Sequence, residues 1–216
     1  MPASPASPPL KSRNSPGRPK DLAKRAAILS AAKTLFMACG FEGVRMEQIA
    51  QNAGVSKLTL YSHFGDKEGL LVAVIKAACE QNLPPEFFQH CPEKPVRTHL
   101  LQLAEALFAI STSAESIALH CMLCSPNNPA PNLAALFWQA GPERTQQGIA
   151  SLLRHWHEAG ELAIENPEQA AEHLYVLIKG KIFTRQLLGL EGLPDTATAK
   201  RHVREAVDLF LRAYRP

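Results

Sequence analysis

The 216-residue sequence contains no apolar run that approaches the roughly 20 residues needed to span a bilayer. Its first residues lack the apolar core of a secretory signal, so we expect a cytoplasmic protein without a membrane partner. The five cysteines are an odd number and do not follow the disulfide pattern of a small secreted domain. We expect most of these thiols to be reduced and buried.

The sequence also lacks the motifs of common enzymes. It has no nucleophile elbow, phosphate-binding loop or paired carboxylates. Cys121 and Cys124 beside His120 have the spacing of half a zinc site, but no second pair of ligands follows. His155 and His157 are two residues apart, on different faces of a helix. We therefore expect neither catalysis nor a metal or other cofactor.

Acidic residues are scarce in the first part of the chain. Residues 1–82 hold 11 Lys and Arg against 6 Asp and Glu, whereas residues 83–216 hold 12 against 14. A basic first segment indicates a polyanionic partner such as nucleic acid. Residues 1–19 are rich in Pro, Ser and Ala and read as a flexible basic arm. Arg18 in this arm could enter a DNA minor groove, or the arm could be a solvated tail that only raises local charge.

No segment alternates β-branched and polar residues over a useful length, so we expect no sheet. Apolar residues recur instead at helical spacing, which predicts an all-α protein of about nine to ten helices. The expected helices cover residues 21–39, 46–53, 57–64, 67–82, 96–113, 115–124, 131–140, 143–159, 167–189 and 197–214.

Two short helices joined by a glycine turn, over residues 46–64, have the helix-turn-helix pattern. Ala50 is small enough for a close helix crossing, Gly54 permits the turn, and Ser56 can cap the second helix. Val55 and Leu60 fill the gap between the helices. A purely structural pair of helices would satisfy the same constraints, so the surface of the second helix decides between the two interpretations.

That surface carries several different hydrogen-bonding groups. Those at its amino terminus can reach base edges or phosphates in a major groove, and those further along can reach flanking phosphates. A lysine at the start of the next helix, beside free backbone N–H groups, could clamp a phosphate. The alternative is that the tyrosine packs in the core and the first lysine is merely solvated. The candidate DNA contacts from this reasoning are Ser56, Lys57, Thr59, Tyr61, His63 and Lys67.

Two stretches carry a family resemblance: GRPKDLAKRAAILSAAKTLFMACGF and GFEGVRMEQIAQNAGVSKLTLYSHFGDKEGLL. Over about residues 17–80 the chain resembles the amino-terminal domain of the tetracycline-repressor (TetR) family. The resemblance implies a DNA-binding domain over residues 20–66. It also implies an effector-binding and dimerisation domain over residues 67–216. The implied function is a sequence-specific transcriptional regulator, most often a repressor released by a small molecule. The family's DNA contacts map to Arg45, Ser56, Lys57, Thr59, Tyr61, His63 and Lys67.

The chain departs from the family pattern at three places in this segment. Arg45 stands where many relatives have a Ser or Thr cap, so we expect that cap hydrogen bond to be lost, at about 1 kcal/mol. Leu58 replaces a small residue and could contact a thymine methyl group. Ser62 stands where the family often has a larger residue. These differences leave the operator sequence open.

Two long amphipathic helices, over residues 167–189 and 197–214, match the family's dimerisation helices in place and length. We expect a homodimer that reads a palindromic operator on double-stranded DNA, with half-sites about 34–36 Å apart or slightly more. Gly180 would let two helices approach closely. The alternative is that the apolar stripes only close the core of one subunit.

Apolar and aromatic side chains of the second domain could enclose a cavity for a small apolar or amphipathic effector. Simple core packing is the alternative for each of them. Lys179 or Arg185 could select an acidic effector. The candidate lining residues are Leu103, Phe108, Met122, Phe137, Trp138, Trp156 and Tyr175.

A rival function is a non-specific architectural DNA-binding protein led by the basic arm. Its affinity would fall steeply with salt and would show little preference among sequences. Deleting residues 1–19 would abolish binding in that case, and would only weaken it for a sequence-specific regulator.

Overall fold

The computed structural model describes residues 18–124 and 132–216, and every regular element within these ranges is a helix. The predicted all-α class is therefore confirmed. The expected arm lies outside the described residues, except that its last two residues begin the first helix. The elements are α1 (Arg18–Cys39), α2 (Met46–Asn52), α3 (Lys57–Phe64), α4 (Lys67–Asn82), the 3-10 turn η1 (Pro85–Phe88), α5 (Val96–Ser111), α6 (Ala114–Leu123), α7 (Asn132–Ala140), α8 (Pro142–Glu158), α9 (Pro167–Leu187) and α10 (Thr196–Ala213).

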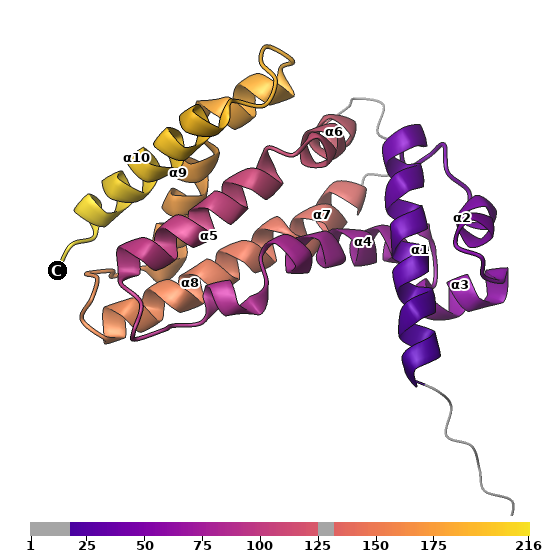
Figure 1. The fold of residues 1–216 in the computed structure, drawn as a ribbon, viewed down its shortest axis with the longest axis horizontal. Helices are drawn as coiled ribbons and strands as arrows, with labels where there is room; N and C mark the ends of the chain where they lie inside the picture. The colour runs from indigo at the N-terminus through magenta and orange to yellow at the C-terminus, as the bar shows by residue number, and fades with distance from the viewer. Residues whose placement is uncertain (1–17, 125–131) are drawn as a thin grey trace, which may run out of the picture.

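The helices form two units joined by α4. Figure 1 shows α1, α2 and α3 at one end of the molecule, with α4 leading from them into a bundle that contains α5, α8, α9 and α10. Helix α4 packs against both α1 and α7. It therefore contacts both units.

The amino-terminal unit has its own apolar core. Ile28, Ile49 and Leu60 are each fully buried there, one from each of its three helices. The left-handed backbone of Gly40 (φ 69°) ends α1, and its N–H donates to the Phe36 carbonyl at 3.0 Å. This is the helix end that the glycine predicted.

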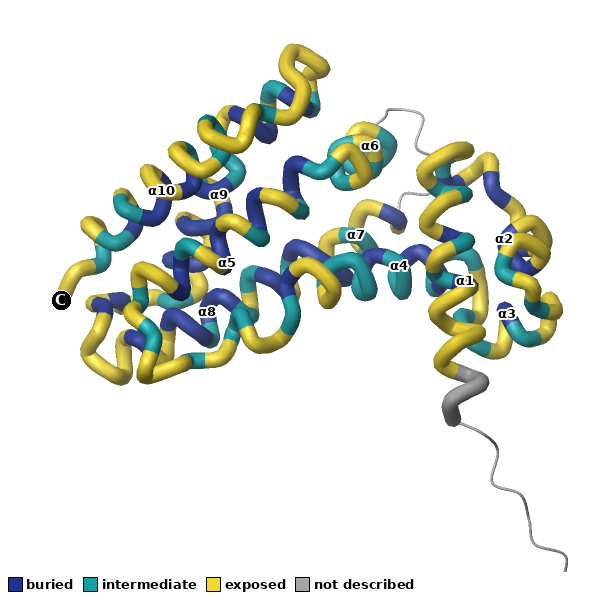
Figure 2. The backbone as a smooth tube through the Cα atoms, in the orientation of Figure 1, coloured by how far each residue is buried: buried dark blue, intermediate teal, exposed yellow. Residues whose placement is uncertain are grey.

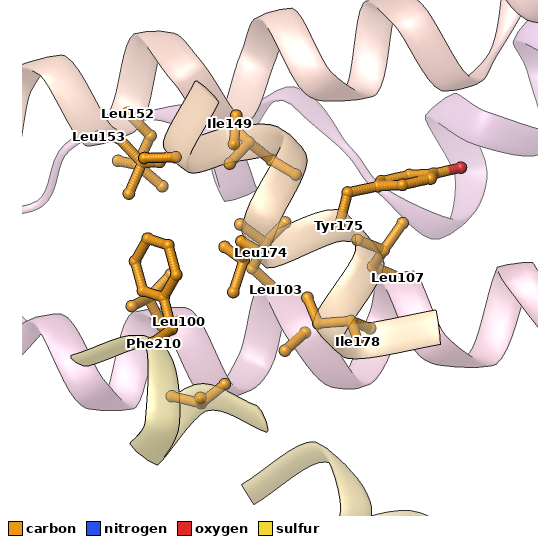
Figure 3. Packing of buried hydrophobic residues seen from close by; sticks show 14 of the residues in the cluster. Leu100, Leu103, Leu107, Ile149, Leu152, Leu153, Leu174, Tyr175, Ile178 and Phe210 are labelled. Atoms are coloured by element: carbon orange, nitrogen blue, oxygen red, sulfur yellow. The ribbon is translucent and has the colours of Figure 1, made fainter. Parts of the chain in front are cut away.

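The carboxy-terminal unit is built around a larger cluster of leucines and aromatic residues. Figure 3 shows Leu103 of α5, Leu152 of α8, Leu174 of α9 and Phe210 of α10 converging on one another. Figure 2 shows that the inward faces of these helices are buried and their outward faces exposed. Removing a large side chain from such a core costs about 2–5 kcal/mol of folding free energy.

Helix α9 bends sharply at Gly180, where the backbone leaves the helical region (φ 51°, ψ −162°). The Nε2 atom of His202, on α10, lies 2.8 Å from the Ile178 carbonyl and donates to it beside the bend. A Cβ atom on Gly180 would lie only 2.5 Å from Cε1 of His202. The glycine therefore permits the close approach of α9 and α10 that the sequence suggested.

The amino terminus of α2 lacks a side-chain cap hydrogen bond, as expected from Arg45 at this position. Arg45 has no acceptor in its side chain, but its N–H donates to Oε1 of Gln48 at 2.8 Å. The glutamine thus keeps one half of a capping box although the serine or threonine half is missing.

The cysteines are less buried than the sequence suggested. All five are free thiols; Cys79 is half-buried and the other four are exposed. The prediction that most are buried is wrong, because four of them lie on outer helix faces or in connections.

Among the described residues, no single helix is long and apolar enough to cross a membrane. Helices α5 and α6 reach that length and hydropathy only as a pair bent by 58°.

Candidate DNA-binding surface and effector cavity

The turn between α2 and α3 holds the two helices in a fixed relation. The Val55 N–H donates to the Ala50 carbonyl at 3.0 Å, and Gly54 takes the left-handed conformation (φ 65°) that the turn requires. Leu60 is fully buried beneath α3. This packing orients the opposite face of α3 toward solvent.

The amino terminus of α3 is capped by its own hydroxyl groups. Ser56 Oγ accepts the Thr59 N–H at 3.1 Å and lies 2.8 Å from Thr59 Oγ1. The two hydroxyls are thus held together at the exposed start of the helix. A rigid pair of this kind can present oxygen atoms to base edges or phosphates.

The remaining exposed face of α3 combines one charge with apolar and aromatic surface. Leu58 is 80% exposed and Tyr61 44% exposed, values that rule out core packing for both. Lys57 projects outward as well, and its Nζ lies 3.0 Å from Oε1 of Glu47 on α2. The hydrogen bond and charge of Lys57 lower the pKa of the Glu47 carboxyl group. The charge of Lys57 thus lies at the surface but is partly neutralised by Glu47.

Arg45 and His63, two further candidate DNA contacts, have different surroundings. Arg45 is exposed at the start of α2, where a guanidinium can meet a phosphate. His63 is half-buried, and its ring centroid lies 5.8 Å from that of Phe64. Their contacts with DNA stay predictions.

Lys67 does not project as the sequence suggested. Its ammonium group donates to the carbonyls of Phe41 (2.9 Å) and Val44 (3.3 Å) and lies 4.3 Å from the centroid of the Phe41 ring. Glu42 Oε2 lies 3.9 Å away. The prediction of a free side-chain phosphate clamp is corrected here, because the loop between α1 and α2 turns its carbonyls toward this lysine.

Glu47 is the residue of this surface that the sequence analysis missed. Its relation to Lys57 depends on the crossing of α2 over the start of α3, so spacing along the chain gives no signal for it. Leu58, which lies outside the predicted set of contacts, is exposed on the same surface.

A cavity of about 410 Å³ lies where the two units meet. Its size falls in the range of small-molecule sites. Phe36 and Phe41 from the amino-terminal unit form part of its wall, and Leu71 and Ile75 from α4 form another part. A molecule bound here would touch both units directly.

Three of the candidate lining residues, Met122, Phe137 and Tyr175, lie on the wall of this cavity. Figure 3 shows the Tyr175 hydroxyl group directed away from the leucine cluster. Burial raises the pKa of this phenol to about 12, so it is neutral near pH 7.

The other predicted lining residues do not face the cavity. Leu103 and Trp156 are fully buried in the leucine cluster, and Phe108 packs with its ring centroid 5.5 Å from that of His202. Trp138 is 47% exposed and lies in an adjoining surface hollow, which shares Tyr175 with the cavity. Leu103, Phe108 and Trp156 are core residues because helical periodicity marks an inward face but does not tell packed core from cavity wall.

The two basic candidates for an acid-selecting group are also elsewhere. Lys179 lines the surface hollow beside Trp138, with its Nζ 3.7 Å from the Phe183 ring centroid. Burial lowers its pKa to about 8. Arg185 pairs with Glu191 at 2.6 Å. At the cavity itself, Lys33 of α1 lies 3.6 Å from a carboxylate oxygen of Glu115 on α6.

Comparison with known proteins agrees with this arrangement. A family model described as "Bacterial regulatory proteins, tetR family" matches residues 28–74. A second, described as "AefR-like transcriptional repressor, C-terminal domain", matches residues 98–216, more than half of the chain. The two matches correspond to the helix-turn-helix unit and to the bundle.

Curated relatives and solved structures extend the match to nearly the whole chain. The uncharacterised HTH-type regulator YdeS of Bacillus subtilis is 30% identical over 92% of each chain. Regulators from Escherichia coli are 49% identical over 63 residues, and the chain spans only 30% of their length.

Two solved structures share the fold at moderate identity. A TetR-family regulator from Mesorhizobium loti has a TM-score of 0.75 at 27% identity, over 91% of this chain and 99% of that one. The structure titled Flavonoid-responsive Regulator FrrA has a TM-score of 0.69 at 29% identity, over 89% and 97%. The matches along both units show that this chain belongs to the TetR family of DNA-binding transcriptional regulators.

Proposed function

We propose that this protein is a sequence-specific repressor that binds a palindromic operator as a homodimer and is released by a small effector. The observation that carries the proposal is the solvent-facing surface of α3, where Lys57, Leu58 and Tyr61 are exposed together. A charge, an apolar group and a phenol on one helix suit a major groove, where phosphates and base edges alternate. The AefR-like repressor domain supports the direction of regulation.

Exposed apolar side chains on the last two helices support a dimer. Val176 and Leu188 are each 67% exposed, and Leu193 and Leu209 are 65% and 47% exposed. They lie on α9, on the connection to α10 and on α10 itself, the segments predicted to pair. A two-fold dimer would place two copies of α3 against successive major grooves.

The position of the cavity supports release by an effector. A ligand there would contact α1 and α4, and the Lys33–Glu115 ion pair joins α1 to α6 across the same junction. A change in this junction would alter the angle between the α3 helices of the two subunits. Ligand and operator would then weaken each other's binding by the same factor. The FrrA title describes that relative as responsive to a flavonoid, which supports a small amphipathic ligand in this fold.

Footprinting on the DNA upstream of the protein's own gene tests the proposal. We expect a protected palindrome whose half-sites lie about one helical turn apart, and binding that persists with excess random DNA at physiological salt. Equal affinity for random DNA under those conditions would refute sequence-specific regulation and favour an architectural role.

The Lys57→Ala variant is expected to bind the operator about tenfold more weakly and to lower the salt slope by about 0.9 per subunit. Electrophoretic mobility shifts across a salt series measure both quantities. Arg144→Ala is the control, since Arg144 is an exposed cation on α8, away from α3 and from the two helices proposed to pair. A Lys57→Ala salt slope equal to that of the control would remove Lys57 from the phosphate contacts.

The Glu47→Gln variant is expected to bind both operator and random DNA about threefold more tightly, because it removes a negative charge beside Lys57. Unchanged affinity for random DNA would show that Glu47 does not restrain non-specific binding.

A further inference from the structure

His120 is the titratable side chain on the cavity wall that the proposed function leaves unexplained. It lies on α6 and lines the cavity. Its ring stands edge-on between Phe137 and Phe183, with centroid distances of 4.9 and 5.0 Å and interplanar angles of 80° to each. The two phenyl rings fix the plane of the imidazole.

The hydrogen bonds of His120 determine which nitrogen carries the proton. Nδ1 lies 2.7 Å from the Ser116 carbonyl oxygen, which can only accept. Nδ1 therefore donates, and in the neutral ring Nε2 is left with a lone pair. Burial lowers the pKa of His120, and the charge of Lys179 lowers it further, so the ring is neutral near pH 7. No described residue donates a hydrogen bond to Nε2.

The cavity offers little to an anion. The lysine on its wall, Lys33, is already paired with Glu115. Lys179, which has no carboxylate partner among the described residues, lines the adjoining surface hollow, with its Nζ 3.7 Å from the centroid of the Phe183 ring that packs against His120. A carboxylate that entered the cavity would lose its hydration without an unpaired cation on the cavity wall itself.

The rest of the wall favours an aromatic ligand. Phe36, Phe41, Phe137 and Tyr175 present rings to the same space, together with aliphatic side chains from α4. Rings of this kind pack edge-on or offset against a flat apolar ligand. The lone pair of an imidazole nitrogen can accept a hydrogen bond from a neutral hydroxyl group on such a ligand.

Building on the proposed function, we infer that the cavity selects an uncharged, hydroxyl-bearing aromatic effector whose hydroxyl group donates to Nε2 of His120. His120 is then a specificity-determining residue for the effector. It accepts one hydrogen bond from the ligand while the Ser116 carbonyl and two phenyl rings hold its orientation.

Three probes of matched shape test the inference by calorimetric titration of the full chain without DNA at pH 7.5. They are biphenyl-4-ol, which donates, 4-methoxybiphenyl, which only accepts, and biphenyl-4-carboxylate, which is charged. We expect biphenyl-4-ol to bind about tenfold more tightly than either of the others. Equal affinities, tightest binding of the carboxylate, or no binding of any probe would overturn the inference.

Two variants assign the preference to this residue. His120→Phe keeps the ring and removes the acceptor, so biphenyl-4-ol is expected to lose about tenfold in affinity while 4-methoxybiphenyl is unchanged. His155→Phe is the matched control: His155 also has Nδ1 2.7 Å from the carbonyl four residues earlier, but it is exposed on α8 and does not line the cavity. Equal losses for both probes in His120→Phe would assign His120 a packing role only.

The probe series on the unaltered protein stands even if His120→Phe folds poorly, which thermal unfolding would reveal. Operator footprinting is a separate measurement. A protected operator combined with equal probe affinities would overturn the ligand preference and leave the regulator intact. A preference for the hydroxyl probe without a protected operator would overturn the proposed regulator and leave the ligand preference intact.

Discussion

The Gly180→Ala variant is expected to lose about 3 kcal/mol of unfolding free energy. Two costs combine. A Cβ atom on a backbone at φ 51°, ψ −162°, close to a region essentially restricted to glycine, costs about 1–3 kcal/mol, and the overpacked contact with His202 costs a further 1–3 kcal/mol. The new methyl group would lie 2.5 Å from Cε1 of His202, so α9 and α10 could not keep their present distance. Urea denaturation measures the loss.

The same variant is expected to weaken the dimer, since the exposed apolar residues predicted to pair lie on these two helices. Analytical ultracentrifugation over a dilution series measures that change. Gly189→Ala is the matched control, because Gly189 has a similar φ of 67° but no atom within 4 Å of its added Cβ. It should lose only about 1 kcal/mol, the backbone cost alone. Equal losses in the two variants would show that the contact with His202 is unimportant.

Local features of the sequence predicted local structure well. Ser56 and Asp66 cap α3 and α4 as expected, with side-chain oxygens 3.1 and 2.7 Å from the N–H groups three residues on. Gly40 and Gly54 have the left-handed backbone that their turns need. These outcomes depend on a few neighbouring residues, so a short window of sequence contains the information.

Features that depend on how distant elements meet were predicted only in part. Leu103 and Phe137 have the same apolar periodicity, yet one is sealed in the bundle and the other faces the cavity. The difference is decided by how α7 and α4 meet the amino-terminal unit. The ion pair of Lys57 with Glu47 depends likewise on the angle between two helices.

Lys67 is the clearest instance, and the Lys67→Met variant tests its role. We expect the variant to lose roughly 2–3 kcal/mol of unfolding free energy, since a hydrogen bond to a charged group contributes about 1.5–3 kcal/mol. The ammonium group is the donor for the carbonyls of Phe41 and Val44, and methionine retains only the aliphatic contact with the Phe41 ring. Urea denaturation gives the free energy.

The salt dependence of operator binding separates this internal role from a phosphate contact. Suppose that Lys67 holds the loop before α2 against α4. The Lys67→Met variant, measured under conditions where it is fully folded, should then have the same salt slope as the unaltered protein. A phosphate contact would instead lower the slope by about 0.9 per subunit. Lys57→Met is the comparison, because its lysine is an exposed candidate contact with a single ion pair. It should lower the salt slope with little change in stability, the opposite result to Lys67→Met. A reduced slope and unchanged stability in Lys67→Met would return this lysine to the DNA-binding surface.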